Sequence, residues 1–350
     1  MNSQKSVLIL DAGNSIIKAK IARRERGEVA FPHALRPLTE TEYNNILERS
    51  KTNGASADYV RINGRPYVVG ESAERHGVHT QRTGSARYVR DYYGLFAAAV
   101  LGRLYERGRE VSIFGSHPPG DVNFRQDLME AVIGDWAVDV QGRQRHFRVT
   151  YANTFDEPVG GLMNVLLTED GQHYQHTEIS GGRSLVIDIG GFTTDYLAVN
   201  PGGEVDYSLA RSVPIGVQNV MSDFEDSFRA NNLEAVKDTP VLPPERVRRA
   251  IATGIFEGGG HRYTCENEVQ EATSMMLNRI ADTYQRIAGG ALSWDAIILT
   301  GGGSGLLHKR LLPILKHENI ILADELEGIH LANVRGGLKL WRLYEALQIL

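Results

Sequence analysis

The sequence predicts an α/β protein made of two related halves, and three observations carry this prediction. Residues 185–199 read as a buried strand, then a turn with two adjacent glycines, then a returning strand, which is the pattern of a β-hairpin. Residues 8–22 repeat the same order. Residues 296–300 form an apolar run that ends in a glycine-rich turn before a helical pattern, as in many α/β proteins.

Both predicted hairpins carry an Asp-x-Gly turn directly after the first strand. Glycine allows backbone N–H groups to approach a ligand, and successive N–H groups in a turn can cradle an anion. A carboxylate beside a phosphate needs a cation between them, and Mg²⁺ binds through one or two carboxylates. One such turn could be an ordinary hairpin turn, but a repeat in register favours phosphate binding. The aligned pairs are Asp11 with Asp188, Gly13 with Gly190 and Lys18 with Asp195.

The composition is that of an ordinary globular chain. The 350 residues are 42% hydrophobic and 23% charged, which suits about two domains. A net charge of −5 argues against a broad basic face for nucleic acid. The single cysteine, Cys265, excludes intrachain disulfides and a cysteine-based zinc site. No apolar run reaches the length of a membrane span, so we expect a soluble cytoplasmic protein without membrane contact.

The first half is expected over 1–180, with a small inserted subdomain at 33–86. That insert is polar and contains a hairpin over 58–70 that turns on Asn63-Gly64. After it, residues 83–93 place Arg87 and Arg90 near three tyrosines, with Arg82 just before them. We expect this segment to contact a partner protein rather than nucleic acid.

The rest of the first half reads as regular elements. We expect helices over 94–107 and from 121 to about 133, a strand over 111–115 and a hairpin over 137–150. A further helix starts at Pro158, where proline suits the first turn, and Gly160 and Gly161 would let it pack closely on another helix. Glu157 stands at its N-terminus, and from the sequence alone it favours a helix-dipole role.

The second half is expected over 181–350, with a small inserted subdomain at 216–290. Its predicted elements are a strand over 206–214, helices over 217–228, 244–253 and 266–287, a polar loop over 231–244, a strand over 320–322 and a C-terminal helix from 332. The basic helix over 244–253 would present a solvated face, and Met275 and Met276 would fill the core. The glycines at 301–303 have neither the dinucleotide-binding spacing nor a P-loop lysine.

Five segments together resemble the motifs of one superfamily. They are Asp11-Ala-Gly-Asn-Ser-x-x-Lys18, Glu157-Pro-Val-Gly-Gly161, Asp188-Ile-Gly-Gly-Phe-Thr-Thr-Asp195, Leu299-Thr-Gly-Gly-Gly303 and Ala332-Asn-Val-Arg-Gly-Gly337. Their order is similar to that of the two phosphate, two connecting and adenosine motifs in actins, heat-shock ATPases and sugar kinases. Within this superfamily the chain looks most like the ParM-type actins that segregate bacterial and archaeal plasmids, although segments 33–86 and 229–262 match no member.

The resemblance implies an actin-like two-domain ATPase fold of duplicated ribonuclease H-like halves. It implies ATP or ADP with Mg²⁺ in the cleft between the halves, with Asp11 and Asp188 holding Mg²⁺ through waters and Glu157 orienting the attacking water. Asp156 is the alternative to Glu157. The implied nucleotide-binding residues are Gly13, Asn14, Ser15, Lys18, Gly190, Gly191, Phe192, Thr193 and Thr194 at the phosphates, and Gly301, Gly302 and Gly303 at the adenosine.

The function expected from the resemblance is a cytoskeletal ATPase that forms dynamic filaments, for plasmid DNA segregation or cargo positioning. Its partners would be other copies of itself and a DNA-binding adaptor, with no direct contact to nucleic acid. A small-molecule kinase and a non-polymerising nucleotide-dependent binding protein are the alternatives on this fold. No sugar-pocket motif is found, and no peptide-binding domain follows Leu350, while the polar segments 33–86 and 229–262 suit contacts between subunits.

Overall fold

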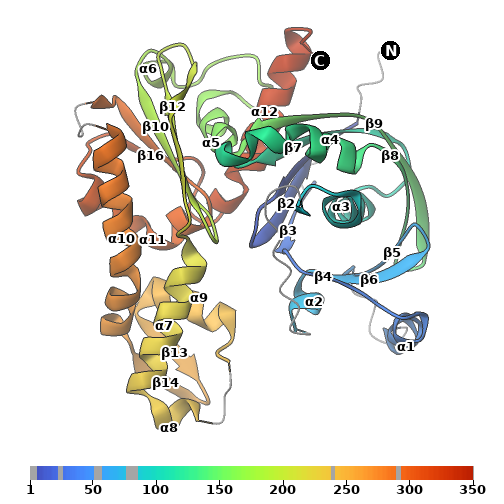
Figure 1. Cartoon of the computed structure of the whole chain (residues 1–350), viewed down its shortest axis with the longest axis horizontal. Helices are drawn as coiled ribbons and strands as arrows, with labels where there is room; N and C mark the ends of the chain where they lie inside the picture. The colour runs from blue at the N-terminus through green and yellow to red at the C-terminus, as the bar shows by residue number, and fades with distance from the viewer. Residues whose placement is uncertain are drawn as a thin grey trace. The chain divides into compact units, whose positions relative to one another are not determined.

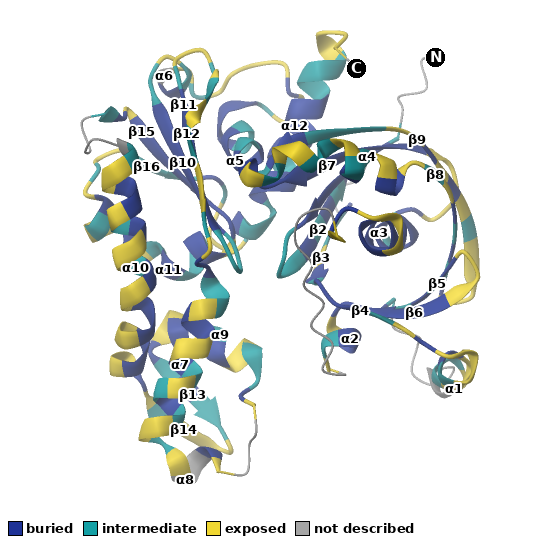
Figure 2. Ribbon diagram, viewed as in Figure 1, coloured by how far each residue is buried: buried dark blue, intermediate teal, exposed yellow. Residues whose placement is uncertain are grey.

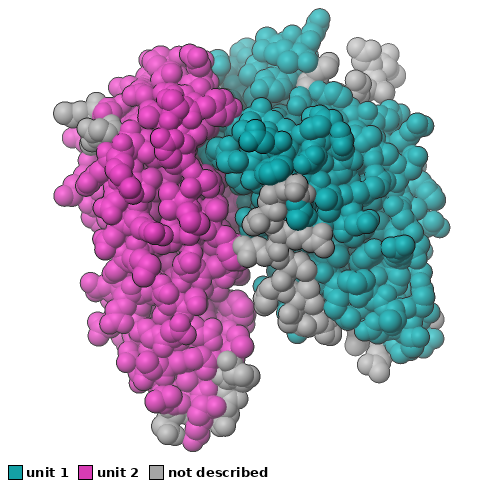
Figure 3. All heavy atoms as spheres, viewed as in Figure 1, with its two compact units in different colours: residues 1–175, 333–350 teal, residues 176–332 magenta. Residues whose placement is uncertain are grey.

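The computed structural model describes residues 6–22, 27–50, 57–75, 86–237, 241–288 and 293–349. Contacts divide the chain into two compact units, residues 1–175 with 333–350 and residues 176–332 (Figure 3). The sequence-based division assigned residues 333–350 to the second half, whereas their contacts group them with unit 1. Parts of both predicted inserts lie outside the described residues, including Arg82. Within the described ranges, no helix combines the length and apolar character needed to cross a bilayer.

Both units contain the same five-stranded arrangement. Two antiparallel pairings are followed by two parallel ones in each sheet. The α/β fold with duplicated halves is therefore confirmed. In unit 1 the order is β3 (Glu28–Pro32), β2 (Ile16–Ile21), β1 (Val7–Ala12), β7 (Glu110–His117) and β9 (Arg143–Asp156); in unit 2 it is β12 (Val205–Val213), β11 (Thr194–Val199), β10 (Ser184–Ile189), β15 (Ala296–Thr300) and β16 (Ile320–Leu322).

The sheet of unit 1 continues beyond β9 to nine strands. The added strands, in sheet order, are β8 (Gly134–Val140), β5 (Tyr59–Ile62), β6 (Arg65–Val69) and β4 (Leu35–Pro37). The turn predicted at Asn63-Gly64 is confirmed, and both residues have the positive φ that a tight hairpin turn requires. Because β5 pairs with β8, the strands of segment 33–86 extend the main sheet; helices α1 (Glu40–Ser50) and α2 (Glu71–Arg75) flank them.

Helix α3 (Leu95–Leu104) forms the centre of unit 1. The sheet curves around it in Figure 1, and Figure 2 colours the helix mostly dark blue because every residue from Leu95 to Gly102 is buried. An apolar helix of this kind needs enclosure on all sides, which the long sheet supplies. A Cβ at Gly102 would lie 2.6 Å from Val138 of β8, so glycine permits this close packing.

Helix α12 (Ala332–Ala346) packs on helix α5 (Glu157–Leu166) through glycines. A Cβ on Gly336 would overlap the carbonyl of Gly160, so the two backbones meet directly, as the sequence predicted for Gly160. Arg335 on the same helix bonds Glu28 of β3, with Nη2 2.9 Å from Oε2. These contacts explain why the C-terminal helix belongs to unit 1.

The insert of unit 2 is mainly helical and contains a small hairpin. Its elements are α7 (Val217–Asn231), α8 (Leu233–Val236), α9 (Pro244–Thr253), β13 (Ile255–Gly258), β14 (His261–Thr264) and α10 (Glu266–Ala288). Aromatic side chains such as Phe224, Phe228 and Phe256 are buried at its centre. The hairpin and α8 were not predicted, and Met275 is 61% exposed rather than in the core, unlike buried Met276.

Shorter elements complete the two units. Asp121, predicted to cap a helix, lies inside the 3₁₀ turn that precedes α4. These elements are η2 (Arg90–Gly94), η3 (Pro119–Phe124) and α4 (Arg125–Val132) in unit 1, and α6 (Thr177–Ser180), α11 (Gly302–Leu315) and η5 (Ile329–Leu331) in unit 2.

Candidate functional site

The β1–β2 hairpin carries the first group of predicted site residues. Asp11 stands near the end of β1 and is fully buried, and Lys18 is its direct cross-strand partner on β2. Lys18 Nζ lies 2.6 Å from Asp11 Oδ2, which compensates the buried carboxylate. Asp11 Oδ1 has no hydrogen-bond partner among the described residues, so this oxygen could accept a bond from a bound group.

The turn of this hairpin is fixed by a buried histidine. Gly13, Asn14 and Ser15 are half-buried. His33 Nδ1 lies 2.6 Å from the Gly13 carbonyl oxygen, and the His33 backbone N–H donates to the Ser15 carbonyl over 2.9 Å. Burial lowers the pKa of His33 to about 4, so its ring is neutral at pH 7 and Nδ1–H is assigned as the donor. The His33 ring and the His33 backbone N–H thus bind the carbonyls of Gly13 and Ser15, which fixes the turn.

The β10–β11 hairpin of unit 2 repeats this arrangement with one change. Asp188 and Asp195 are cross-strand partners, as Asp11 and Lys18 are, and both are buried. The alignment made from the sequence is therefore reproduced in the strand register. Thr193 Oγ1 donates to Asp195 Oδ2 over 2.9 Å. Unit 2 thus offers a second carboxylate where unit 1 offers an ammonium.

The turn of the second hairpin is anchored to the start of α7. The N–H groups of Val217 and Gln218 donate to the carbonyls of Gly190 and Gly191 over 3.1 and 2.8 Å. A Cβ on Gly216 would lie 2.5 Å from Gly191, so the close approach requires glycine there. Phe192 and Thr193 remain half-buried at the turn, and Thr194 is buried, with its hydroxyl donating to the carbonyl of Ile215 over 2.8 Å.

The glycines after β15 pack on β10 within the same unit. A Cβ on Gly301, whose φ is +83°, would overlap Asp188 Oδ1, and one on Gly303 would overlap Ile189. Gly302 is exposed, with its nearest neighbour 3.6 Å from an added Cβ. Close packing against β10 thus explains by itself why positions 301 and 303 are glycine. At Gly302 there is room for a larger side chain or for a ligand.

A buried arginine connects the first hairpin with Glu157. Arg87 is 2% exposed and donates to the Ala12 carbonyl at the end of β1. Its guanidinium lies 4.0 Å from Glu157 Oε1 and 3.7 Å from Asp121 Oδ2. Glu157 is the first residue of α5, and its side chain is 12% exposed. The sequence analysis missed this role for Arg87.

The expectation that segment 83–93 contacts a partner is wrong for its described tyrosines and for Arg87. Tyr88, Tyr92 and Tyr93 are buried, and Tyr88 Oη donates to Asp121 Oδ2 over 2.8 Å. Arg90 donates to the carbonyls of Ile133 and Asp135. The three tyrosines and Arg87 therefore serve the interior of unit 1, where the rings and the guanidinium find partners, while Arg90 stays exposed.

Asp156 and Glu157 have different surroundings despite being neighbours. Asp156 is buried, and its two carboxylate oxygens lie 3.4 Å from His117 Nδ1 and 3.5 Å from Arg125 Nη2. Burial lowers the pKa of His117, whose Nε2 accepts from Arg125 Nε over 2.9 Å. Asp156 is thus engaged in a local network, and Glu157 is the better candidate for a group that acts on a ligand.

The carboxylates fit a hydrated magnesium ion better than a protein-built metal cage. Among the described residues, no group of three or more His, Cys, Asp or Glu side chains could hold a metal. Mg²⁺ needs only one or two carboxylates because it keeps most of its waters. The buried, unbonded Oδ1 of Asp11 beside Gly13, where an added Cβ would lie 3.5 Å from it, suits a water of such an ion.

Two family models match the chain. Residues 10–160 match the N-terminal domain of actin-like proteins, and residues 186–312 match the C-terminal part of the archaeal, MreB-like actin homologue. The chain has an actin-like, ParM-type fold. The matched ranges include residues 11–18 of the first β-hairpin and residues 188–195 of the second. Each unit of this actin-like protein therefore carries one of the two Asp-x-Gly turns inside a matched range. No protein with a curated description matches the chain.

Solved structures agree with this fold along the whole chain. The archaeal actin homologue Ta0583 is similar with a TM-score of 0.74 at 20% identity, over 99% of this chain and 100% of that one. A ParM filament structure from Clostridium botulinum gives 0.75 at 17% identity, with 96% and 99% covered. ParM of Bacillus thuringiensis with ATP gives 0.70 at 16% identity, with 98% and 99% covered. At these identities, the likeness establishes the fold.

Proposed function

We propose that this actin-like protein binds ATP with Mg²⁺ and hydrolyses it slowly. The observation that carries the proposal is the repeat of one hairpin in both units. Each repeat sets a buried aspartate and a glycine turn at the end of a strand, in the same cross-strand register. Ta0583 was solved with ADP and Bacillus thuringiensis ParM with ATP, and both share this fold.

In this proposal both hairpins act on the phosphates of one ATP. The turn backbones at 13–15 and 190–194 bind phosphate oxygens through N–H groups other than that of Gly190, which donates to the Thr193 carbonyl over 2.9 Å. Lys18 offers its ammonium to a phosphate. Asp11 and Asp188 hold Mg²⁺ through waters. Bound Mg²⁺ neutralises phosphate charge, which is most of what phosphoryl transfer requires. The residues at 301–303 serve the adenosine side.

Glu157 is proposed to orient the attacking water and to accept its proton. Its carboxylate is mostly buried at the first residue of α5, and Arg87 holds it from one side. One such group with positioned phosphates suits slow turnover, as in a molecular switch.

We propose further that ATP drives assembly into filaments in the cytoplasm, with a DNA-binding adaptor linking them to a plasmid or another cargo. A head-to-tail contact between unlike surfaces does not close and therefore propagates as a helix. The polar segments 33–86 and 229–262, one in each unit, supply the unlike surfaces. The related ParM of Clostridium botulinum was solved as a filament.

Sedimentation and light scattering test this function. With ATP, scattering should rise steeply above a critical protein concentration, and negative-stain images should show filaments that disappear as ATP is consumed. ADP should not support assembly, and a non-hydrolysable analogue should give persistent filaments. A protein that stays monomeric well above micromolar concentration with all three nucleotides, while hydrolysing ATP, contradicts the filament proposal. ADP release that depends on an added hexose would instead indicate a kinase.

A further inference from the structure

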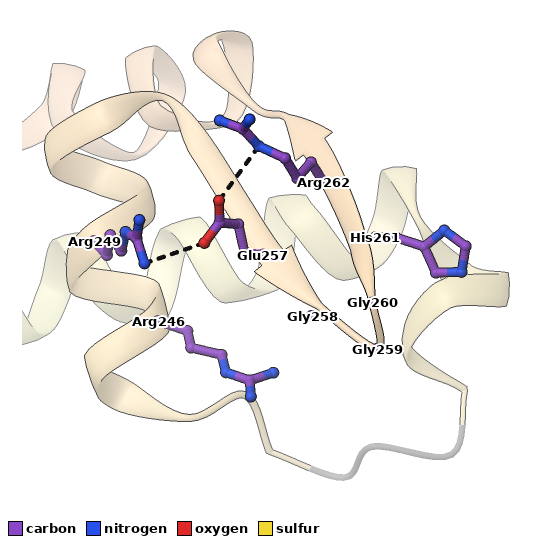
Figure 4. A pocket seen from close by; sticks show the side chains of 8 residues that line it. All are labelled: Arg246, Arg249, Glu257, Gly258, Gly259, Gly260, His261 and Arg262. Carbon is purple, nitrogen blue, oxygen red and sulfur yellow. Dashed lines mark ion pairs between the residues drawn. The ribbon is translucent and has the colours of Figure 1, made fainter.

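We propose that the β13–β14 hairpin and helix α9 of unit 2 form a docking site for an acidic, extended segment of a partner protein. A recess of about 430 Å³ lies between the helix and the hairpin turn. Figure 4 shows Arg249 and Arg262 reaching toward Glu257 from the helix and from the hairpin, with Arg246 nearer the glycine turn and His261 pointing away to the other side. The recess is lined by Arg246, Arg249, Glu257, the glycines at 258–260, His261 and Arg262.

Glu257 organises two of the arginines without consuming their donors. Its Oε2 lies 3.1 Å from Arg249 Nη1, and its Oε1 lies 3.3 Å from Arg262 Nε (dashed in Figure 4). Each guanidinium carries five N–H donors, so most remain available to a ligand. The side chains of Arg249 and Arg262 are 67% and 70% exposed, which leaves those donors open to an incoming carboxylate.

Arg246 adds a third positive charge. Within the described ranges it forms no ion pair, and its Nη1 lies 3.5 Å from the position that a Cβ on Gly258 would take. Three arginines against one glutamate leave the recess with a net positive charge, on a chain whose total is −5. Charge complementarity therefore selects an acidic ligand, and arginine forks match carboxylates in bidentate geometry.

The hairpin also offers main-chain groups to an extended ligand. Among the residues that the structure describes, β13 and β14 pair only with each other. An unpaired strand edge can bind a peptide through backbone hydrogen bonds. At the turn, an added Cβ on Gly259 or Gly260 would meet nothing within 4 Å, so a ligand chain can approach the backbone closely.

A second recess on the same hairpin favours a peptide over nucleic acid. It has a volume of about 750 Å³ and shares Gly258, Gly259 and His261 with the first. Its lining adds Asn231, Asn232 and Tyr263 together with Leu233, whose side chain is 68% exposed. A segment that crosses the turn would thus meet arginines and then an apolar, amide-lined surface. A phosphate backbone needs a row of cations, which Glu257 interrupts.

The test measures binding of a short fluorescent peptide of alternating glutamate and leucine to the full chain by anisotropy, without nucleotide so that assembly does not compete. Arg246→Ala should weaken binding about fivefold, the scale of one charge pair. Arg248→Ala, on the same helix but outside the recess, is the matched control and should stay within about twofold. Glu257→Gln should strengthen binding because it removes the one opposing charge.

Four results would overturn the proposal. Equal effects of Arg246→Ala and Arg248→Ala would mean that only the general charge of the helix matters. Weaker binding with Glu257→Gln, at unchanged melting temperature, would assign Glu257 to the ligand contact and reverse the charge argument. Displacement of the peptide by duplex DNA at lower concentration than by unlabelled peptide would favour nucleic acid. Loss of ATP-driven pelleting in Arg246→Ala with unchanged peptide binding would make the recess a subunit contact.

Discussion

Lys18 Nζ lies 2.6 Å from Asp11 Oδ2, so the proposed magnesium carboxylate of unit 1 already has a cation of the protein beside it. Across the other hairpin, the partner of Asp188 is the acidic Asp195. The two hairpins therefore share a backbone design but differ in charge. In unit 1 the ammonium is available both to Asp11 and to a phosphate, and this dual use makes Lys18 the first residue to test.

Replacing Lys18 by methionine should destabilise the protein. The change leaves the fully buried Asp11 carboxylate without its counter-charge, and breaking such a pair costs about 3 kcal/mol of unfolding free energy. The loss of unfolding free energy is measured by urea unfolding of Lys18→Met, Asp11→Asn and the double variant. The double variant should recover part of the loss. Strictly additive effects in this cycle would show that the two side chains do not interact energetically.

Replacing Glu157 by alanine should slow ATP hydrolysis roughly 10²–10⁴-fold while leaving ATP binding intact, because a positioned acid–base group is lost. Its filaments should outlast those of the wild type, since the ATP state persists. Turnover and melting temperature are measured together. A loss of only ~1 kcal/mol of stability with normal turnover would assign Glu157 to the helix dipole alone.

Replacing Arg87 by lysine should lower kcat about tenfold with little change in KM, because lysine has no planar fork to reach both the Ala12 carbonyl and Glu157. Arg90→Lys is the matched control. Arg90 lies three residues further on; it donates to the carbonyls of Ile133 and Asp135, and its guanidinium lies over the Trp136 ring. Equal kcat in the two folded variants would remove Arg87 from the positioning of Glu157.

The stability of unit 1 should fall in mild acid through His33. Burial lowers the pKa of this side chain to about 4, so the unfolded chain takes up its proton first as the pH drops. The stabilising effect is complete above pH 6.5 and is lost between pH 6.5 and 4, up to about 3 kcal/mol. His33→Asn keeps a donor for the Gly13 carbonyl and does not titrate. Its urea-unfolding free energy should fall less than that of the wild type between pH 7 and 5. An equal fall in the variant and the wild type would show that His33 does not cause the loss of stability in acid.

The hairpins and most helices could be predicted because their signals are local. Asp11 and Lys18 are seven positions apart, so the strand–turn–strand pattern alone sets which residues face each other. The same holds for Asp188 and Asp195. Helix α10 follows its apolar period, with Val269, Ala272 and Ile280 buried. The Asp-x-Gly register of both hairpins was therefore available from the sequence.

Features that depend on distant contacts could not be predicted. Arg87 owes its burial to Ala12 and Glu157, which lie far away along the chain, so a segment of arginines and tyrosines read as a surface. The C-terminal helix joins unit 1 because Gly336 meets Gly160. Strands β13 and β14 are joined by the glycines at 258–260, which have low strand propensity. The sequence pattern there therefore did not predict a hairpin.

Calorimetric titration with Mg²⁺ and ATP, under conditions that prevent assembly, tests the central claim that both hairpins serve one nucleotide. The wild type should bind one ATP per chain. Asp11→Ala and Asp188→Ala, one in each hairpin, should each weaken that single site at least tenfold, since each removes a carboxylate that faces the magnesium ion. Two ATP per wild-type chain, or wild-type affinity in either folded variant, would contradict the account.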